Sequence, residues 1–175
     1  MENIHARWCQ IMIIARGSAA HPRRIDKTSE FIGAVLFLLS IGIQQVAPMQ
    51  TPHIFASCLF YRPSGFILVC SSVLVLRGTL AELAKHKQPH EPGKATTRLV
   101  ITGPFQYSRN PTYASIVLLL QPGLAICFDN TWMNLLIPVS MLAFWYILIR
   151  DEEEYLRTKF REEWVEYCQT TRRWI

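Results

Sequence analysis

Four long apolar stretches separated by polar segments dominate the chain. They cover residues 31–47, 65–83, 111–128 and 131–149. A helix needs roughly 20 residues to cross the hydrocarbon core of a bilayer, and lengths of about 17 to 25 serve this purpose. Each stretch therefore fits one transmembrane helix. The pattern predicts an all-α, polytopic membrane protein with about four transmembrane helices.

The main alternative is a soluble bundle of four buried helices. Helices of such a bundle carry a polar stripe that recurs with a period of 3.6 residues. The segments 31–43 and 142–149 show almost no such stripe. Half of the residues are hydrophobic and the mean hydropathy is +0.16, which is high for a small soluble domain but does not decide the question. The missing polar stripe favours the membrane.

The placement of the basic residues supports four spans. The chain has 18 Lys and Arg against 13 Asp and Glu, a net charge of +5. Four spans put 17 of the 18 basic residues on one side of the membrane and leave only Arg62 on the other. Basic residues gather in cytoplasmic loops, so we expect both termini and the long middle loop in the cytoplasm. The membrane would be a bacterial inner membrane or the endoplasmic reticulum.

These observations also define the expected organisation and partners. Residues 1–30 form a basic cytoplasmic segment, and residues 31–175 are expected to form a single membrane domain. A nucleic-acid partner would explain the charge but not the apolar stretches, so we expect the lipid bilayer as partner and no nucleic acid. Five scattered cysteines include no CxxC pair, so the sequence predicts neither a disulfide framework nor a metal site. The pattern leaves the oligomeric state open.

The first candidate site lies where the third apolar stretch begins. Asn110 is a favoured N-cap residue and Pro111 is favoured at the first helical position, so we expect a capped helix start facing the cytoplasm. Its free N–H groups and dipole, with Arg109 beside them, suit a carboxylate or phosphate. Membrane anchoring is the alternative, since arginine and aromatic residues are ordinary at an interface. Three aromatic residues surround this start: Phe105, Tyr107 and Tyr113.

The second candidate site is the acidic run at residues 151–154, directly after the fourth stretch. A helix is expected to continue through it to about Gln169. It carries an apolar stripe at helical spacing, formed by Leu156, Phe160, Trp164 and Tyr167. The run is either a solvated start of an amphipathic surface helix or a carboxylate site for hydroxyl or ammonium groups of a ligand. Acidic residues contribute little to topology, so orientation alone does not explain four of them.

Together these motifs resemble a known family. The chain reads TGPFQYSRNPTYAS, then a two-helix hairpin, then EExxLxxxF, a spaced aromatic pair and RRW. This pattern is similar to the isoprenylcysteine carboxyl methyltransferases and the related phospholipid N-methyltransferases, which are integral membrane enzymes. The resemblance covers residues 85–175, about half of the chain, and the two-part motif is specific. The first two stretches match in hydropathy only.

The resemblance implies a pocket for S-adenosylmethionine between the long loop, the start of the third span and the acidic pair, with a lipophilic methyl acceptor reaching it from the bilayer. Arg109 and Arg150 are the candidate catalytic residues. The residues that would bind the cofactor are His90, Leu99, Val100, Gly103, Phe105, Asn110, Pro111, Tyr113, Glu152 and Glu153.

The chain departs from the family pattern at several positions. Members with a carboxylate acceptor have a substrate-facing arginine one turn before the acidic pair. Leu148 occupies that place here, and Arg150 is the nearest candidate to replace it. Ser115 and Arg161 stand where glycine is common, and Arg172 where proline is common.

Three functions remain open at this stage. The resemblance implies methyl transfer to an acceptor similar to an isoprenylcysteine carboxylate. A phospholipid amine or a small thiol is the alternative acceptor, and no general base for an amine is evident. The chain could also be a non-enzymatic membrane subunit that keeps the same helices. Pro122, in the middle of the third stretch, is expected to kink that helix. Such a kink would either open a lateral entrance for the acceptor or serve packing.

Overall fold

The computed structural model describes residues 28–49, 59–89 and 96–175. Throughout these ranges the regular secondary structure is helical and contains no strand. The predicted all-α class is therefore confirmed. The basic segment 1–30 lies outside the described residues, except that its last three residues begin the first helix. His90, an expected cofactor contact, also lies outside them.

Each of the four apolar stretches folds as helix. The first two form single helices, α2 (Thr28–Val46) and α4 (Tyr61–Lys85). The third comprises α5 (Pro111–Ser115), a π-helical turn η2 (Ile116–Leu120) and α6 (Gln121–Cys127). The fourth comprises α7 (Thr131–Leu135), α8 (Ile137–Phe144) and a second π-helical turn η3 (Trp145–Ile149). It continues directly into α9 (Arg150–Thr170), and a short 3-10 turn, η1 (Gly103–Gln106), precedes α5.

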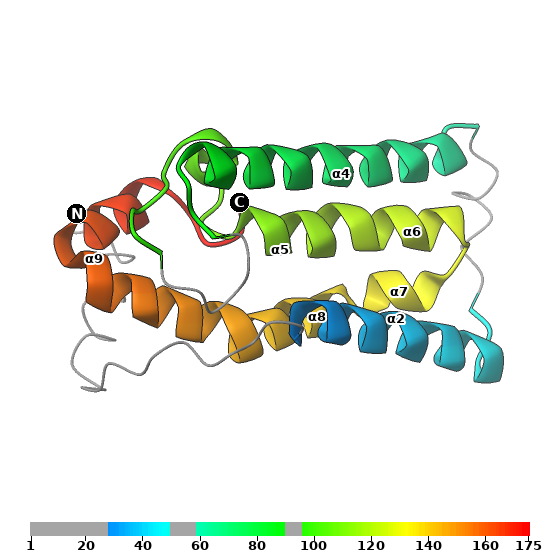
Figure 1. Cartoon of the computed structure of the whole chain (residues 1–175). Helices are drawn as coiled ribbons and strands as arrows, with labels where there is room; N and C mark the ends of the chain where they lie inside the picture. Colours follow the sequence, from blue (N-terminus) through cyan, green and yellow to red (C-terminus); the bar gives the residue numbers. More distant parts are fainter. Residues whose placement is uncertain (1–27, 50–58, 90–95) are drawn as a thin grey trace, which may run out of the picture.

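The helices form a bundle in which neighbours lie side by side. Helix α4 packs along α5, η2 and α6, while α2 packs along α7 and α8 (Figure 1). Helix α9 runs out of the bundle at the end where α5 begins, and the loop that follows α4 lies at the same end (Figure 1). The polar segments of the sequence thus come together at one end of the apolar bundle.

Two prolines interrupt the apolar helices. The wide turn η2 comes just before Pro122, and the Gln121 N–H bonds the Ile116 carbonyl five residues back. Pro122 has no N–H to continue an α-helical pattern, so the expected kink takes the form of a π turn. Pro138 lies in the first turn of α8, and α7 ends at Leu135. The fourth stretch is therefore helical as expected, but it is divided at Leu136, just before the proline that can donate no backbone hydrogen bond.

The bundle interior holds several small polar side chains, while many large apolar side chains of α2 and α4 face outward. Five hydroxyl side chains are essentially fully buried: Ser40, Ser72, Thr79, Ser115 and Ser140. Each donates to a backbone carbonyl, and the Ser72 hydroxyl reaches across from α4 to the Ser115 carbonyl at 3.1 Å. Leu74 is 70% exposed, and Phe31, Leu38, Phe66 and Ile67 of the same two helices are also exposed. Small residues between helices and apolar residues outside are typical of membrane helices.

Within the described ranges, length and composition identify one helix that is able to cross a membrane, α4. Its 25 residues correspond to about 37 Å at 1.5 Å per residue, which exceeds the hydrocarbon thickness of roughly 30 Å. The apolar parts of α2 and of the third stretch are shorter helices. Four separate crossings remain a prediction.

The apolar core of the bundle lies next to the acidic start of α9. It contains Tyr113 and Val117 from the third stretch and Phe144, Leu148 and Ile149 from the fourth. The Tyr113 and Phe144 rings contact each other with centroids 5.5 Å apart. This packing brings α5 close to the beginning of α9, and so places the two sequence motifs beside each other.

Candidate functional site

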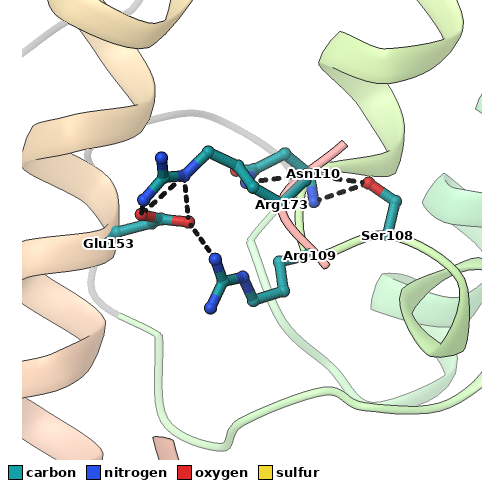
Figure 2. Close-up of polar contacts among 5 residues, drawn as sticks. All are labelled: Ser108, Arg109, Asn110, Glu153 and Arg173. Atoms are coloured by element: carbon teal, nitrogen blue, oxygen red, sulfur yellow. Dashed lines mark hydrogen bonds and ion pairs between the residues drawn. The ribbon is translucent and has the colours of Figure 1, made fainter. Parts of the chain in front are cut away.

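Three segments distant in sequence meet at the polar end of the bundle. They are the loop that leads through η1 into α5, the beginning of α9, and the closing segment, residues 171–175. Figure 2 shows five of the residues that join them. The structure therefore brings together the RNPxY motif and the acidic run, which the resemblance placed in one site.

The junction at Asn110 and Pro111 begins a helix as expected, but it is not capped as expected. Helix α5 starts at Pro111, and the Asn110 side chain makes no capping hydrogen bond. Its Nδ2 instead donates to the Arg173 carbonyl at 3.4 Å, and the Asn110 N–H donates to Ser108 Oγ at 3.1 Å. The prediction of a side-chain cap was wrong, because the Asn110 amide is turned toward the Arg173 carbonyl instead of toward the N–H groups of α5. Asn110 links two segments here.

Glu152 is the carboxylate that lies against the start of α5. Its Oε2 accepts a hydrogen bond of 3.4 Å from Tyr113 Oη. Tyr113 is buried and Glu152 is half-buried. Burial raises the pKa of Glu152 to about 7, against the lowering effect of the Tyr113 hydroxyl, and the neighbouring Glu153 charge raises it further. A carboxyl with this pKa can accept or release a proton near neutral pH.

Glu153 is held by two guanidinium groups. Arg173 donates to both of its carboxylate oxygens, with distances of 2.7 and 3.0 Å, and Arg109 approaches one oxygen at 3.5 Å (Figure 2). Arg109 also packs over the Trp164 ring, 5.7 Å from its centroid. Glu153 thus belongs to an internal ion-pair cluster. Of the acidic pair, Glu152 is the carboxylate better able to receive a ligand.

The other expected cofactor residues of the loop differ in their surroundings. Val100 is buried, whereas Leu99 lines a cavity between the loop and α9. Gly103 has a positive φ of 62°, and a side chain there would lie 3.2 Å from Glu82. This left-handed conformation explains the glycine of the TGP motif. The Phe105 carbonyl accepts a 2.6 Å hydrogen bond from Tyr167 Oη, which ties the loop to α9.

The cavity beside Leu99 has a volume of about 750 Å³, within the range of roughly 300–1,000 Å³ of ligand sites. Apolar and polar groups alternate around it. Its lining consists of Thr97, Arg98, Leu99, Ile101, Gln106, Phe160, Glu163, Glu166, Tyr167, Thr170 and Thr171. Leu99 is the one expected cofactor residue in this lining. The second half of α9 supplies a wall of the cavity, although the sequence predicted only an amphipathic face there.

Arg150 is directed away from this cluster. Its guanidinium packs over the exposed Tyr146 ring at 5.3 Å and lies 3.9 Å from Asp151. Leu148, at the place of the family's substrate-facing arginine, is 2% exposed and lies in the apolar core. The structure thus brings Arg109 to the site, but not Arg150.

Sequence reasoning missed the part that Arg173 takes in the site. The RRW motif was noted as part of the family pattern, but Arg173 was not assigned a partner. Its pairing with Glu153 joins residues 20 positions apart on a helix and on the segment after it. The sequence offers one signal, which is a basic residue in a motif that also contains an acidic pair. That signal does not specify which basic residue pairs with which carboxylate.

An apolar helical bundle with its polar side chains gathered at one end is typical of a membrane-associated protein. The family model of the phospholipid methyltransferases matches residues 53–163, and the chain belongs to this family. The resemblance inferred from the two-part motif is confirmed. No curated protein and no solved structure gives a significant match.

Proposed function

We propose that the protein is a membrane-embedded methyltransferase that uses S-adenosylmethionine and methylates a lipophilic acceptor. Membership of the phospholipid methyltransferase family supports methyl transfer in general. The observation that carries the finer proposal is the hydrogen bond between Tyr113 and Glu152. It joins the two halves of the family motif into one polar site at the edge of an apolar bundle.

The residues present fit such a cofactor. S-adenosylmethionine supplies an electrophilic methyl group on a sulfonium centre, together with ammonium and hydroxyl groups that a carboxylate can bind. Glu152 would receive those groups, and Asn110, Pro111 and Tyr113 would form the adjoining wall. The cavity at Leu99 offers room of suitable size near the loop. Close positioning and exclusion of water can supply most of the rate enhancement in a displacement of this kind.

The surroundings of Glu152 favour an amine acceptor over a carboxylate. Leu148 places an apolar side chain where a substrate-facing arginine would stand. Arg109 and Arg173 are engaged with Glu153, and Arg150 packs on Tyr146. Among the described residues of the site, no cation is then left to receive a carboxylate acceptor beside Glu152. An ammonium group on the acceptor would instead be attracted to the negative carboxylate that holds the cofactor.

The proposal includes four membrane crossings with the site on the cytoplasmic side. The outward-facing apolar side chains support contact with lipid, and the one-sided distribution of basic residues supports the orientation. The lipophilic acceptor would then reach the site from the bilayer, and the cofactor from the cytoplasm. A small thiol would be an alternative acceptor, since a thiolate needs no base once formed.

The test is methyl transfer by the purified protein reconstituted in vesicles. Methyl-labelled S-adenosylmethionine is supplied with vesicles that contain an aminophospholipid, a prenylated cysteine or a lipophilic thiol. We expect cofactor binding at micromolar concentration and label in the amine-bearing lipid. Label in the prenylated cysteine would overturn the choice of acceptor. Absence of cofactor binding would overturn the enzymatic proposal and favour a non-enzymatic subunit.

A further inference from the structure

The closing segment, residues 171–175, turns back and follows the loop before α5. The Arg109 N–H donates to the Arg172 carbonyl at 2.9 Å. The Arg173 carbonyl accepts from Ser108 Oγ at 3.1 Å and from Asn110 Nδ2 at 3.4 Å (Figure 2). Three successive residues of the loop are thus bonded to two successive carbonyls. These contacts place the closing segment directly on the residues that lead into Pro111.

The same segment is also attached to α9 and to the apolar core. The Arg173 guanidinium binds both oxygens of Glu153, which adjoins Glu152. Trp174 packs against the core cluster that contains Tyr113. Arg173 therefore contacts one wall of the proposed site through its carbonyl and the other wall through its side chain. A single residue spans the two walls.

We infer that residues 171–175 act as a clip that fixes the distance between the start of α5 and the start of α9, and that Arg173 is a positioning residue for methyl transfer. This inference rests on the proposed function. Arg173 acts on Glu152 and Tyr113 only indirectly. It holds Glu153, which adjoins Glu152, and Asn110, which directly precedes the helix that carries Tyr113. Without it, Glu152 would be free to move away from the wall formed by α5.

The geometry explains why arginine is suited to this position. A guanidinium presents several N–H donors in a rigid plane that matches the two oxygens of a carboxylate. A lysine would keep the charge but could not reproduce the paired contact. Glu153 and Arg173 are both more than two-thirds buried in their side chains, where a charge-assisted pair is less screened than at an open surface.

Arg173→Ala, compared with Arg172→Ala, tests the clip. Arg172 is an exposed arginine that contributes only its backbone carbonyl to the clip, and the substitution leaves that carbonyl in place. Misplacement of a reacting group by about 1 Å can reduce a rate about 100-fold. We therefore expect Arg173→Ala to lower kcat by about 10- to 100-fold, with a smaller change in KM for S-adenosylmethionine. Arg172→Ala should behave as the wild type, and Arg173→Lys should recover part of the loss.

Amide hydrogen exchange provides a second measurement that does not depend on activity. The clip predicts faster exchange at Arg109 and Asn110 in Arg173→Ala than in Arg172→Ala, in folded protein. This result would support the clip even if the wild-type protein transferred no methyl group, which would contradict the proposed function alone. Wild-type kcat in folded Arg173→Ala would overturn the positioning role. Unchanged exchange at both amides would overturn the clip itself. If Arg173→Ala does not fold, Arg173→Lys replaces it in both measurements.

Discussion

Tyr113 and Glu152 are 39 positions apart in sequence, and a hydrogen bond of 3.4 Å from the Tyr113 hydroxyl joins them. Tyr113 lies on the first turns of α5 and Glu152 on the first turn of α9. The two residues come from the two halves of the family motif. Their contact occurs because the Tyr113 ring packs on Phe144, two turns before Glu152 along the continuous helix. The apolar core thus sets the position of the polar site.

Glu152→Gln should lose most of the binding of S-adenosylmethionine. Hydrogen bonds that involve a charged group contribute roughly 1.5–3 kcal/mol, which corresponds to about 10- to 150-fold in affinity. The glutamine keeps the shape of the side chain and removes its charge. Titration of the purified protein with labelled cofactor measures this effect.

Glu154→Gln provides the matched control for that experiment. The Glu154 carboxylate pairs with Arg157 on the same helix at 2.5 Å and is 43% exposed, so it faces away from Tyr113. This variant should bind the cofactor within about twofold of the wild type, because the Glu154 carboxylate pairs with Arg157 rather than with a residue of the site. Equal, near-normal affinities in both variants would remove Glu152 from the site.

The raised pKa of Glu152 predicts a pH-dependent stability of the ligand-free protein. Between the ordinary value of 4.5 and about 7, the native state keeps a proton on Glu152 that the unfolded state has released. Stability should therefore fall as the pH rises through this window, by up to about 1.4 kcal/mol per pH unit. Below pH 4.5 this contribution is complete, and above pH 7 it is lost.

Unfolding in detergent at pH 5 and pH 8 measures this dependence. Glu152→Gln cannot ionise, so its stability should change less between the two pH values than that of the wild type. The difference between the pH dependence of stability in the wild type and in Glu152→Gln gives the contribution of Glu152, because all other titrating groups are common to both proteins. An identical pH dependence in both proteins would show that Glu152 titrates in the native state as it does in the unfolded state.

The contact between α4 and α6 depends on two facing glycines. A side chain at Gly123 would lie 2.9 Å from the Gly65 carbonyl and 2.9 Å from Val69 Cγ2. Gly123→Ala should therefore force the helices apart and lower the free energy of unfolding by about 1–3 kcal/mol. At Gly42 of α2 an added side chain meets nothing within 4 Å, so Gly42→Ala should not destabilise the protein. Unfolding of both variants in detergent compares them, and equal stabilities would contradict the close approach of α4 and α6.

Local patterns predicted the helical content, and the resemblance to the family predicted the meeting of the two motifs. Apolar length defined the four helical stretches to within a few residues. Pro138 was visible, but its effect on α7 and α8 was not anticipated, since prolines are also tolerated inside membrane helices.

The side-chain partners at the site could not be predicted in the same way. Asn110 satisfied every local requirement of an N-cap, yet it bonds the carbonyl of Arg173, 63 positions away. Glu152 and Glu153 are adjacent and look equivalent in sequence, but helical geometry turns one toward Tyr113 and the other toward two arginines. Such differences depend on the path of the closing segment, which no local pattern defines.

The proposed topology predicts which positions react with a membrane-impermeant thiol reagent. Cysteines introduced at Lys94 and at Phe128, in a chain whose native cysteines are replaced by serine, mark the two sides. Since 17 of the 18 basic residues share one side and basic loops remain cytoplasmic, the reagent should label position 128 from outside intact cells and position 94 only after lysis. Labelling of position 94 in intact cells would reverse the orientation.

Arg161 adopts a strained backbone conformation within α9, and relieving that strain should stabilise the protein. Its φ of 41° and ψ of −102° interrupt the helix, at a place where the family pattern commonly has glycine. A non-glycine residue in such a region costs on the order of 1–3 kcal/mol, and glycine offsets part of the gain by about 0.5–1 kcal/mol of added backbone entropy. Arg161→Gly should therefore raise the free energy of unfolding by about 1 kcal/mol. Arg161→Ala removes the same charge but keeps the Cβ atom, so it should give no such gain. Thermal unfolding of the two variants under identical conditions separates the effect of strain from that of charge. An equal rise in the stability of both variants would assign the effect to the lost guanidinium. A fall in the stability of Arg161→Gly alone would show that this residue is helical in solution.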